Sequence, residues 1–274
     1  MKPEFLIIGG DKRQQYLKKR LEAEFYSVFH IRYPADVSEL KKIESYSHII
    51  LPVPISKDKR SIYTDDKLDI EINELMRKIK ACHIVYGTGF DSKFLDFFED
   101  NSITYYDFMK DKAFKLFNAY LTALGTVRLM LESTDDIITG KKALIIGFGD
   151  VAKTLAEKLK ALAVDVRIAA RNQSQLTNAE FCGYKTMALE SIGESISKFD
   201  FVFGSVPANI LTFNDVINMG EECVYFELAS SPYTADSEHF TKAGKKYILA
   251  SGLPGKFLPK ASSDILYDFI LKNL

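Results

Sequence analysis

Lys142-Ala-Leu-Ile-Ile-Gly147-Phe-Gly149-Asp-Val-Ala152 decides the fold of this chain, because a short apolar run ends there in a G-x-G-x-x-A turn. The turn runs straight into Lys153–Leu162, an amphipathic segment that predicts a helix. Gly147 permits the tight turn, Gly149 lets the backbone approach a pyrophosphate, and Ala152 lets the helix pack close to the strand. The N-terminus of such a helix presents free N–H groups to phosphates. The stretch therefore predicts dinucleotide binding; the alternative is a glycine turn in a doubly wound sheet that binds nothing.

The segment after that helix indicates which dinucleotide is bound. Val164–Arg171 is typical of a strand, and it continues into Asn172-Gln-Ser174 without a carboxylate. Sites that prefer NAD place Asp or Glu there for the ribose hydroxyls, whereas Arg can pair with a 2′-phosphate. We therefore predict NADP(H), with NAD as the second choice; the alternative is an ordinary exposed arginine. The expected cofactor-binding residues are Gly147, Phe148, Gly149, Asp150, Val151, Arg171, Asn172, Ser174, Val206, Pro207 and Leu253.

The composition argues against several classes of protein. The chain has 274 residues, 47% hydrophobic and 27% charged, with 36 basic residues against 37 acidic ones. These values argue against disorder and against binding of nucleic acid through a basic surface. No apolar run approaches the roughly 20 residues that span a bilayer, so no membrane partner is expected. The three cysteines are far apart, which predicts no metal site and a reducing, cytoplasmic setting.

Strand-like and helix-like segments alternate along both halves of the chain. The alternation predicts an α/β fold with two doubly wound, Rossmann-like parallel sheets joined by a long helix. We assign residues 1–115 and 256–274 to a discontinuous N-terminal substrate domain. Residues 116–135 form the connecting helix, and residues 136–255 form the NAD(P)-binding domain. Residues 55–67 lack a clear period and predict a surface loop.

Ligands of open α/β sheets bind at the carboxyl ends of the strands, so these ends are the candidate sites. The first strand ends in Gly9-Gly10-Asp11-Lys12-Arg13-Gln14, a polar and basic turn at the start of a helix. Lys12 and Arg13 would suit a carboxylate or a phosphate there. The alternative is a solvated first helical turn. The four histidines show no spacing typical of a catalytic site.

Taken in order, the strand ends resemble those of one family, the dehydrogenase-like A subunit of dipicolinate synthase, over nearly the whole chain. Gly9–Gln14 is similar to the family's opening G-G-D-x-R-Q, and Leu51-Pro-Val-Pro54 is similar to the end of its third strand. The motifs that follow in the family's order are Gly147-Phe-Gly149, Ala170-Arg171, Val206-Pro207, Leu228-Ala-Ser230, Gly252-Leu-Pro-Gly255 and Pro259-Lys260. The first and last of these motifs are specific, and the shared order carries the resemblance.

The chain departs from the family's pattern at positions that bear on the substrate. The family's N-S-x-P-T-A-E-G reads Asn-Ala-Tyr-Leu-Thr-Ala-Leu124-Gly, so a proline and a carboxylate are absent. Its L-A-S-R-P-G-G reads Leu-Ala-Ser-Ser231-Pro-Tyr-Thr, so an arginine is absent. If those two residues serve the substrate, this chain handles the substrate differently or handles another one.

The resemblance implies an NADP-dependent oxidoreductase that converts dihydrodipicolinate to dipicolinate (pyridine-2,6-dicarboxylate) for spore formation. It also implies a partner that resembles the B subunit of dipicolinate synthase, and we expect a homo-oligomer. The small dicarboxylate substrate is expected between the domains, with Arg13 as its main cationic anchor. The expected substrate-binding residues are Lys12, Arg13, Gln14, Thr88, Lys256 and Lys260. The candidates for catalysis or proton handling are Asp11, Arg13, Asp107 and Ser230.

Two alternatives remain open from the sequence. The first is another small-acid NAD(P) dehydrogenase, similar to shikimate or alanine dehydrogenase, because these share the two-domain plan. The second is a redox-sensing or scaffold protein that binds NADP without turnover, which the absent carboxylate and arginine favour.

Overall fold

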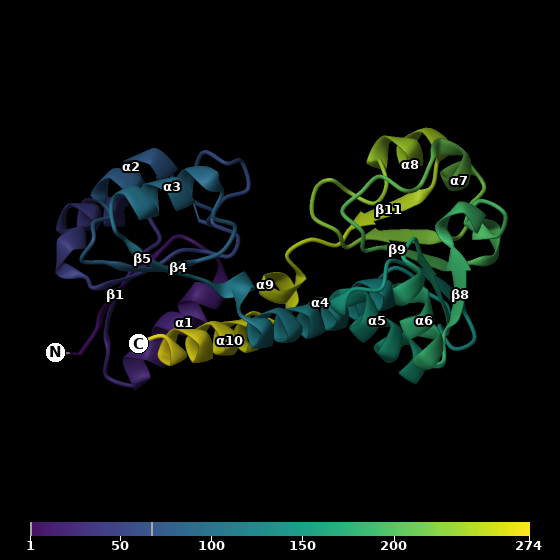
Figure 1. The fold of residues 1–274 in the computed structure, drawn as a ribbon, viewed down its shortest axis with the longest axis horizontal. Coiled ribbons are helices and arrows are strands. Elements are labelled where there is room, and N and C mark those ends of the chain that lie inside the picture. The colour runs from purple at the N-terminus through teal and green to yellow at the C-terminus, as the bar shows by residue number, and fades with distance from the viewer. Residues whose placement is uncertain (1, 67) are drawn as a thin grey trace. The chain divides into compact units, whose positions relative to one another are not determined.

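The computed structural model describes residues 2–66 and 68–274. The chain divides into two compact units, Met1–Asn118 with Pro254–Leu274 and Ala119–Leu253. Each unit contains one parallel sheet with helices on both of its faces (Figure 1). The predicted α/β fold with two doubly wound parallel sheets is therefore confirmed. Met1, which belongs to the expected N-terminal domain (residues 1–115), and Lys67, which belongs to the expected surface loop (residues 55–67), lie outside the described residues.

The sheet of the first unit has five parallel strands in the order β2-β1-β3-β4-β5. The strands are β1 (Glu4–Ile8), β2 (Ser27–Ile31), β3 (His48–Ile50), β4 (Ile84–Gly87) and β5 (Thr104–Asp107). The helices of this part of the chain are α1 (Lys12–Ala23), η1 (Pro34–Ser45), α2 (Ile72–Lys78), α3 (Ser92–Asp100), η2 (Phe108–Lys110), α9 (Leu253–Phe257) and α10 (Pro259–Lys272).

Alternate residues of β1 explain the two layers of helices in the first unit. Leu6 and Ile8 pack into a core shared with α2 and α3, whereas Phe5 and Ile7 pack into a core shared with α1 and α10. All four side chains are fully buried. Successive side chains of a strand point to opposite faces, so a continuous apolar run marks a strand that is covered on both sides. Figure 1 shows α2 and α3 on one face of this sheet and α1 and α10 on the other.

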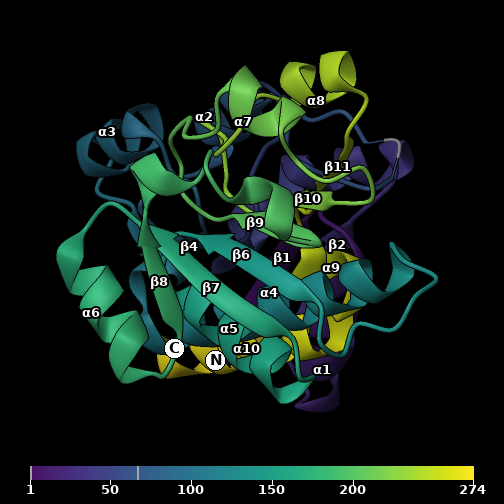
Figure 2. The same ribbon diagram turned by 90° about the vertical axis from the view of Figure 1, so that its right-hand side faces the viewer.

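The sheet of the second unit has six parallel strands in the order β11-β10-β9-β6-β7-β8 (Figure 2). The strands are β6 (Lys142–Ile146), β7 (Asp165–Ala170), β8 (Lys185–Ala188), β9 (Phe201–Gly204), β10 (Val224–Glu227) and β11 (Lys246–Leu249). The helices are α5 (Asp150–Ala161), α6 (Gln173–Phe181), η3 (Leu189–Ser191), η4 (Ile196–Lys198), α7 (Phe213–Ile217) and α8 (Ser237–Ala243).

Strand β6 lies at the centre of this second sheet, and its residues also alternate between two cores. Ala143 and Ile145 pack with α5, whereas Leu144 and Ile146 pack with α7 and α8. Because the strands are all parallel, the carboxyl ends of β6, β7, β9 and β10 lie along one edge of the sheet. That edge therefore collects the turns after these strands.

Helix α4 (Lys112–Glu132) connects the two halves of the chain, and the division between the units falls inside it, after Asn118. Among the described residues, no helix combines the length and the apolar character needed to cross a membrane.

Candidate functional site

The glycine turn of the second unit contains two glycines with different structural reasons. Gly147 has a φ of +98°, a left-handed conformation that favours glycine, and a Cβ added there would lie 2.7 Å from Ser205 Oγ and 2.7 Å from Val206 Cγ2. Gly149 is the N-cap of α5 with an ordinary φ of −82°. A Cβ added at Gly149 would meet no atom within 4 Å. The fold demands the first glycine, whereas the second borders open space at a helix N-terminus, where a pyrophosphate fits.

Arg171 lies one residue beyond β7, the strand that pairs with β6. Its side chain is exposed. The neighbouring Asn172 is the N-cap of α6, and its side chain accepts a hydrogen bond of 2.8 Å from the backbone N–H of Ser174. Asn172 and Ser174 therefore shape the turn, while the guanidinium of Arg171 is exposed at the same edge of the sheet as Gly149.

Two of the expected cofactor-binding residues have buried side chains. Phe148 is 2% exposed and packs against Tyr184, and Leu253 is 1% exposed. A bound molecule can meet only the backbone of these two residues, which corrects any expectation of side-chain contacts. The other expected residues at this edge have accessible side chains: Asp150 and Pro207 are exposed, and Val151 and Val206 are half-buried.

A buried carboxyl group, Glu227, ends β10 at this edge and was not among the residues expected from the sequence. Glu227 is fully buried, and it accepts hydrogen bonds from the Tyr225 hydroxyl (2.8 Å) and from the backbone N–H groups of Ala229 (3.0 Å) and Ala235 (3.2 Å). Burial raises the pKa of Glu227, and these hydrogen bonds oppose the rise. The signal in the sequence is an acidic residue at the end of a buried apolar strand, Val-Tyr-Phe-Glu227.

The turn after β1 in the first unit is organised by Asp11. Asp11 is the N-cap of α1 and forms a capping box with Gln14: its carboxylate accepts from the Arg13 N–H at 2.9 Å, and the Gln14 side chain accepts from the Asp11 N–H at 3.0 Å. The Arg13 guanidinium donates to the same carboxylate, with Nη2 at 2.7 Å from Oδ2, and also to the Val53 carbonyl. Asp11 and Arg13 are 6% and 5% exposed. They therefore form a buried ion pair instead of a solvated helical turn.

This arrangement limits how the turn can bind a substrate. Nε and Nη2 of Arg13 are already used by Asp11 and Val53, so the planar fork expected to hold a carboxylate is occupied on that edge. Among the described residues, none accepts a hydrogen bond from Nη1, which leaves this nitrogen to donate to a ligand. Gln14 is fully buried, so its expected role in substrate binding is corrected to holding the turn. Lys12 is exposed.

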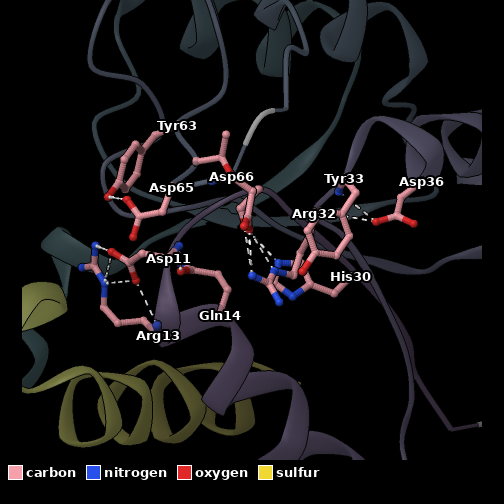
Figure 3. A network of polar contacts seen from close by, with 12 residues as sticks. Asp11, Arg13, Gln14, His30, Arg32, Tyr33, Asp36, Tyr63, Asp65 and Asp66 are labelled. Atoms are coloured by element: carbon pink, nitrogen blue, oxygen red, sulfur yellow. Dashed lines mark hydrogen bonds and ion pairs between the residues drawn. The ribbon is translucent and has the colours of Figure 1, made fainter.

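The segment after β3 is anchored over this turn instead of forming a simple surface loop. The Gly10 N–H donates to the Tyr63 carbonyl at 2.7 Å, and the Asp65 N–H donates to the Gly10 carbonyl at 2.9 Å. Ile55 and Ile62 are buried in the core of the unit. The Tyr63 hydroxyl donates to Asp65 at 2.7 Å, and Figure 3 shows this pair beside Asp11 and Arg13. The polar surface at Arg13 therefore includes a second carboxylate.

His30 supports the same turn from below the surface. Its Nε2 atom lies 2.8 Å from the Gly9 carbonyl oxygen, and burial lowers the pKa of His30 to about 4. Arg32 and Asp66 form an ion pair of 2.8 Å near it (Figure 3). His30 is therefore a neutral hydrogen-bonding group at neutral pH, which agrees with the view that the histidines are not catalysts.

The Gly252–Gly255 motif reaches the Asp11–Arg13 pair. A Cβ added at Gly255 would lie 2.6 Å from Asp11 Oδ2 and 2.8 Å from Arg13 Nε, so a glycine is needed for the motif to pack against the pair. Lys256 follows directly, and both Lys256 and Lys260 are exposed. The structure thus brings Gly255 of the last motif against Asp11 and Arg13 of the first motif within the first unit.

The remaining candidates of the first unit, Thr88 and Asp107, lie apart from this pair in its sheet. Thr88 is buried after β4, two strands away from β1 in the sheet. Asp107 ends β5, three strands away, which is about 14 Å at the usual strand spacing. Its side chain caps η2 by accepting from the Met109 N–H at 2.8 Å. Ser230 is exposed and follows β10 in the second unit. The structure therefore does not gather Asp107 with Asp11 and Arg13.

The fold and the glycine turn define a class: two-unit proteins with a Rossmann-like domain for a nicotinamide dinucleotide, as in dehydrogenases. Residues 118–249 match the family "S-adenosyl-L-homocysteine hydrolase, NAD binding domain". The fold is similar to that of a D-lactate dehydrogenase from Salmonella, with 12% identity, a TM-score of 0.72, and coverage of 98% of this chain and 95% of the other. The family match supports a nicotinamide cofactor in the second unit, and the likeness to the lactate dehydrogenase shows a shared fold.

Within that class, the chain is similar to the A subunit of dipicolinate synthase over nearly its whole length, which confirms the resemblance of its motifs. Residues 4–109 match the family of the N-terminal domain of this A subunit. The chain is 26% identical to the dipicolinate synthase A subunit of Bacillus subtilis (strain 168), over 98% of this chain and 94% of that protein. The crystal structure of the A subunit from Bacillus halodurans has the same fold, with 23% identity, a TM-score of 0.86, and coverage of 99% and 98%.

Proposed function

We propose that this chain is an NADP-dependent dehydrogenase that oxidises a dihydrodipicolinate-type ring to pyridine-2,6-dicarboxylate. The observation that carries the proposal is the glycine turn: Gly149 leaves open space at the N-terminus of α5, and Arg171 is exposed at the same edge of the sheet. The relationship to the A subunit of dipicolinate synthase supports the substrate class. It also supports a cytoplasmic location, a role in spore formation and a partner similar to the B subunit.

The protein's own groups divide into those that bind the cofactor and those that bind the substrate. In the second unit, the N–H groups at the start of α5 would hold the pyrophosphate, and Arg171 would pair with the 2′-phosphate. A bound, oxidised nicotinamide would supply the hydride acceptor, so that a ring carbon of the substrate would give up a hydride and the ring would lose a proton as it becomes aromatic. The chain's task is to hold the ring in the reactive orientation, because correct positioning contributes much of the acceleration in such reactions.

In the first unit, Arg13 meets one carboxylate of the substrate through Nη1, because its other nitrogens are engaged. Asp11 orients that guanidinium instead of accepting the proton, since both of its carboxylate oxygens accept hydrogen bonds from Arg13. Lys12, Lys256 and Lys260 are exposed cations on the same unit that can compensate the second carboxylate. The proposal therefore assigns Asp11 a positioning role and Arg13 a single direct contact.

A second candidate is a dehydrogenase of another small acid. It is favoured by Leu124 and Ser231, which stand where the family carries a carboxylate and an arginine. It is favoured too by Asp65, a carboxylate beside Arg13 that opposes a doubly charged substrate.

Titration of NADPH and NADH against the wild type and Arg171→Ala tests the cofactor assignment. Arg171→Ala should weaken NADPH binding by roughly tenfold to a hundredfold, the equivalent of about 1.5–3 kcal/mol for a charged hydrogen bond, and leave NADH almost unchanged. Arg128→Ala is the matched control, because Arg128 is an exposed arginine of the same unit that pairs with Glu132. Equal affinity of the wild type for NADH and NADPH would overturn the NADP assignment.

Turnover tests the substrate assignment. The purified chain, alone and with a partner of the B type, should reduce NADP when supplied with dihydrodipicolinate. NADP reduction by D-lactate or another small acid, with none from dihydrodipicolinate under either condition, would favour the second candidate. Cofactor binding with no turnover under any condition would identify a protein that binds the dinucleotide without catalysis.

A further inference from the structure

Glu227 is a buried carboxyl group at the cofactor edge of the second unit that the proposed chemistry leaves without a role. It is fully buried, and the described residues form no ion pair with it. Among the described residues, the ionisable groups that interact with it are Tyr225 on its own strand and Tyr247 on β11, and the groups that act on Tyr247 in turn are Tyr233 and Asp236. None of these groups is a cation. A buried carboxyl group without a cation is costly unless it is hydrogen-bonded, so its hydrogen bonds indicate its role.

The hydrogen bonds of Glu227 hold both ends of the segment 228–235. Its Oε1 atom accepts from the Ala229 N–H at 3.0 Å, and its Oε2 atom accepts from the Ala235 N–H at 3.2 Å and from the Tyr225 hydroxyl at 2.8 Å. All three partners donate, and a carboxylate, which accepts only, satisfies all of them. The ionised side chain therefore fastens the start and the end of the segment to β10.

The same segment is fastened to the turn after β9 through Thr234. The Thr234 hydroxyl donates to the Val206 carbonyl at 2.7 Å and accepts from the Val206 N–H at 3.0 Å. Gly204 leaves the space that this arrangement needs, because a Cβ added there would overlap the Tyr225 hydroxyl and lie 2.9 Å from Thr234 Oγ1. Val206 in turn packs against Gly147 of the glycine turn. A continuous series of contacts thus runs from Glu227 to the glycine turn.

We propose that Glu227 is a positioning residue for the nicotinamide cofactor, because it holds the segment 228–235 and, through Thr234, the Ser205–Val206 turn against the glycine turn. The inference rests on the proposed cofactor site. Protonation of Glu227 turns one acceptor oxygen into an O–H group, which a backbone N–H cannot accept from, so the hydrogen bonds that hold the ends of the segment weaken. Burial raises the pKa of Glu227 from its ordinary value. Cofactor affinity should therefore decline as the pH falls through that raised pKa.

The experiment compares Glu227→Gln with the wild type from pH 8 to pH 4, which reaches below the ordinary pKa of a glutamate of about 4.3, with NADPH affinity measured by fluorescence on protein shown to be folded by circular dichroism. The amide keeps the size of the side chain but presents an NH₂ group to partners that donate. At pH 8 the affinity of Glu227→Gln should be at least tenfold weaker than that of the wild type. In acid the two should converge, because the wild-type carboxylate becomes protonated. Glu238→Gln, an exposed glutamate of α8 that pairs with Lys242, is the matched control and should follow the wild type.

Two further measurements keep the test decisive. Tyr225→Phe removes one hydrogen bond to the carboxylate, so the loss at pH 8 should be smaller and the decline should begin at a higher pH. Amide exchange of the segment 228–236 without cofactor should be faster in Glu227→Gln, since the single amide oxygen leaves either the Ala229 N–H or the Ala235 N–H without an acceptor. Faster exchange with unchanged NADPH affinity would overturn the proposal, and so would a loss of affinity that is constant with pH. Failure of the wild type to bind NADPH or NADH would instead contradict the proposed function.

Discussion

Replacement of Gly149 by valine should abolish cofactor binding without unfolding the protein. A Cβ at Gly149 meets no protein atom within 4 Å, and its φ of −82° is open to any residue. The only cost to folding is at the N-cap of α5, where valine is a poorer cap than glycine by about 1 kcal/mol. The variant should therefore fold, with a normal circular dichroism spectrum and a slightly lower melting temperature.

The loss of cofactor affinity should be much larger than this effect on stability. The branched side chain would occupy the space at the N-terminus of α5 that the pyrophosphate needs. If two backbone N–H contacts to the phosphates are lost, each contributing about 1.5–3 kcal/mol as a charged hydrogen bond, the loss is about 3–6 kcal/mol. That is more than a hundredfold in the dissociation constant, since about 1.4 kcal/mol corresponds to a factor of ten.

Fluorescence titration of NADPH measures this loss of affinity. Gly149→Ala, which adds only the β-carbon, should show a smaller loss than Gly149→Val. Gly147→Ala is the contrasting variant, because a Cβ there lies 2.7 Å from both Ser205 Oγ and Val206 Cγ2 on a backbone with a φ of +98°. Gly147→Ala should lower the stability of the unit itself. Binding of NADPH to Gly149→Val within threefold of the wild type would refute the placement of the pyrophosphate.

Two further predictions concern the first unit. Arg13→Ala should lower the free energy of unfolding by about 3–5 kcal/mol, because it leaves the buried Asp11 carboxylate without its cation. In urea unfolding, the double variant with Asp11→Asn should recover part of this loss. An unfolding midpoint of Arg13→Ala equal to that of the wild type would contradict the buried pair. The folded-state pKa of His30, about 4, lies below its unfolded value of 6.5, so the unfolded chain binds more protons between these pH values and acid favours unfolding. Stability should decline by about 3 kcal/mol between pH 6.5 and 4, and a decline of the same size in His30→Gln would assign it to other groups.

Arg13 is held in one orientation inside the first unit, although its motif resembles an open anion-binding turn. The motif Gly9–Gln14 looks like a basic turn open to an anion, yet its arginine is 5% exposed and held by Asp11. A buried ion pair of this kind fixes a guanidinium in one orientation, which suits a specific contact through Nη1. The exposed lysines are better placed to attract a negatively charged substrate, whereas Arg13 is better placed to orient the substrate.

The local sequence by itself determined the glycine turn and its meaning. Gly147, Gly149 and the helix that follows lie within a few residues of each other, so strand, turn and helix are specified by contacts along the chain. The alternation of strand-like and helix-like segments likewise predicted doubly wound sheets, and the continuous apolar runs of β1 and β6 agree with strands that are covered on both faces. The fold class followed from the repetition of these local units.

Only the tertiary structure decided which side chains meet at the sites. Strand β3 lies beside β1, which brings the Val53 carbonyl to Arg13, and the motif at Gly255 packs against the same pair although it lies over 240 residues further along the chain. Glu227 reaches Ala235 and Tyr225 because the segment after β10 folds back over its strand. Contacts between distant segments carry no periodic signal in a single sequence. These contacts place Arg13 in a buried ion pair with Asp11, and they make Glu227 the hydrogen-bond acceptor that holds the segment after β10.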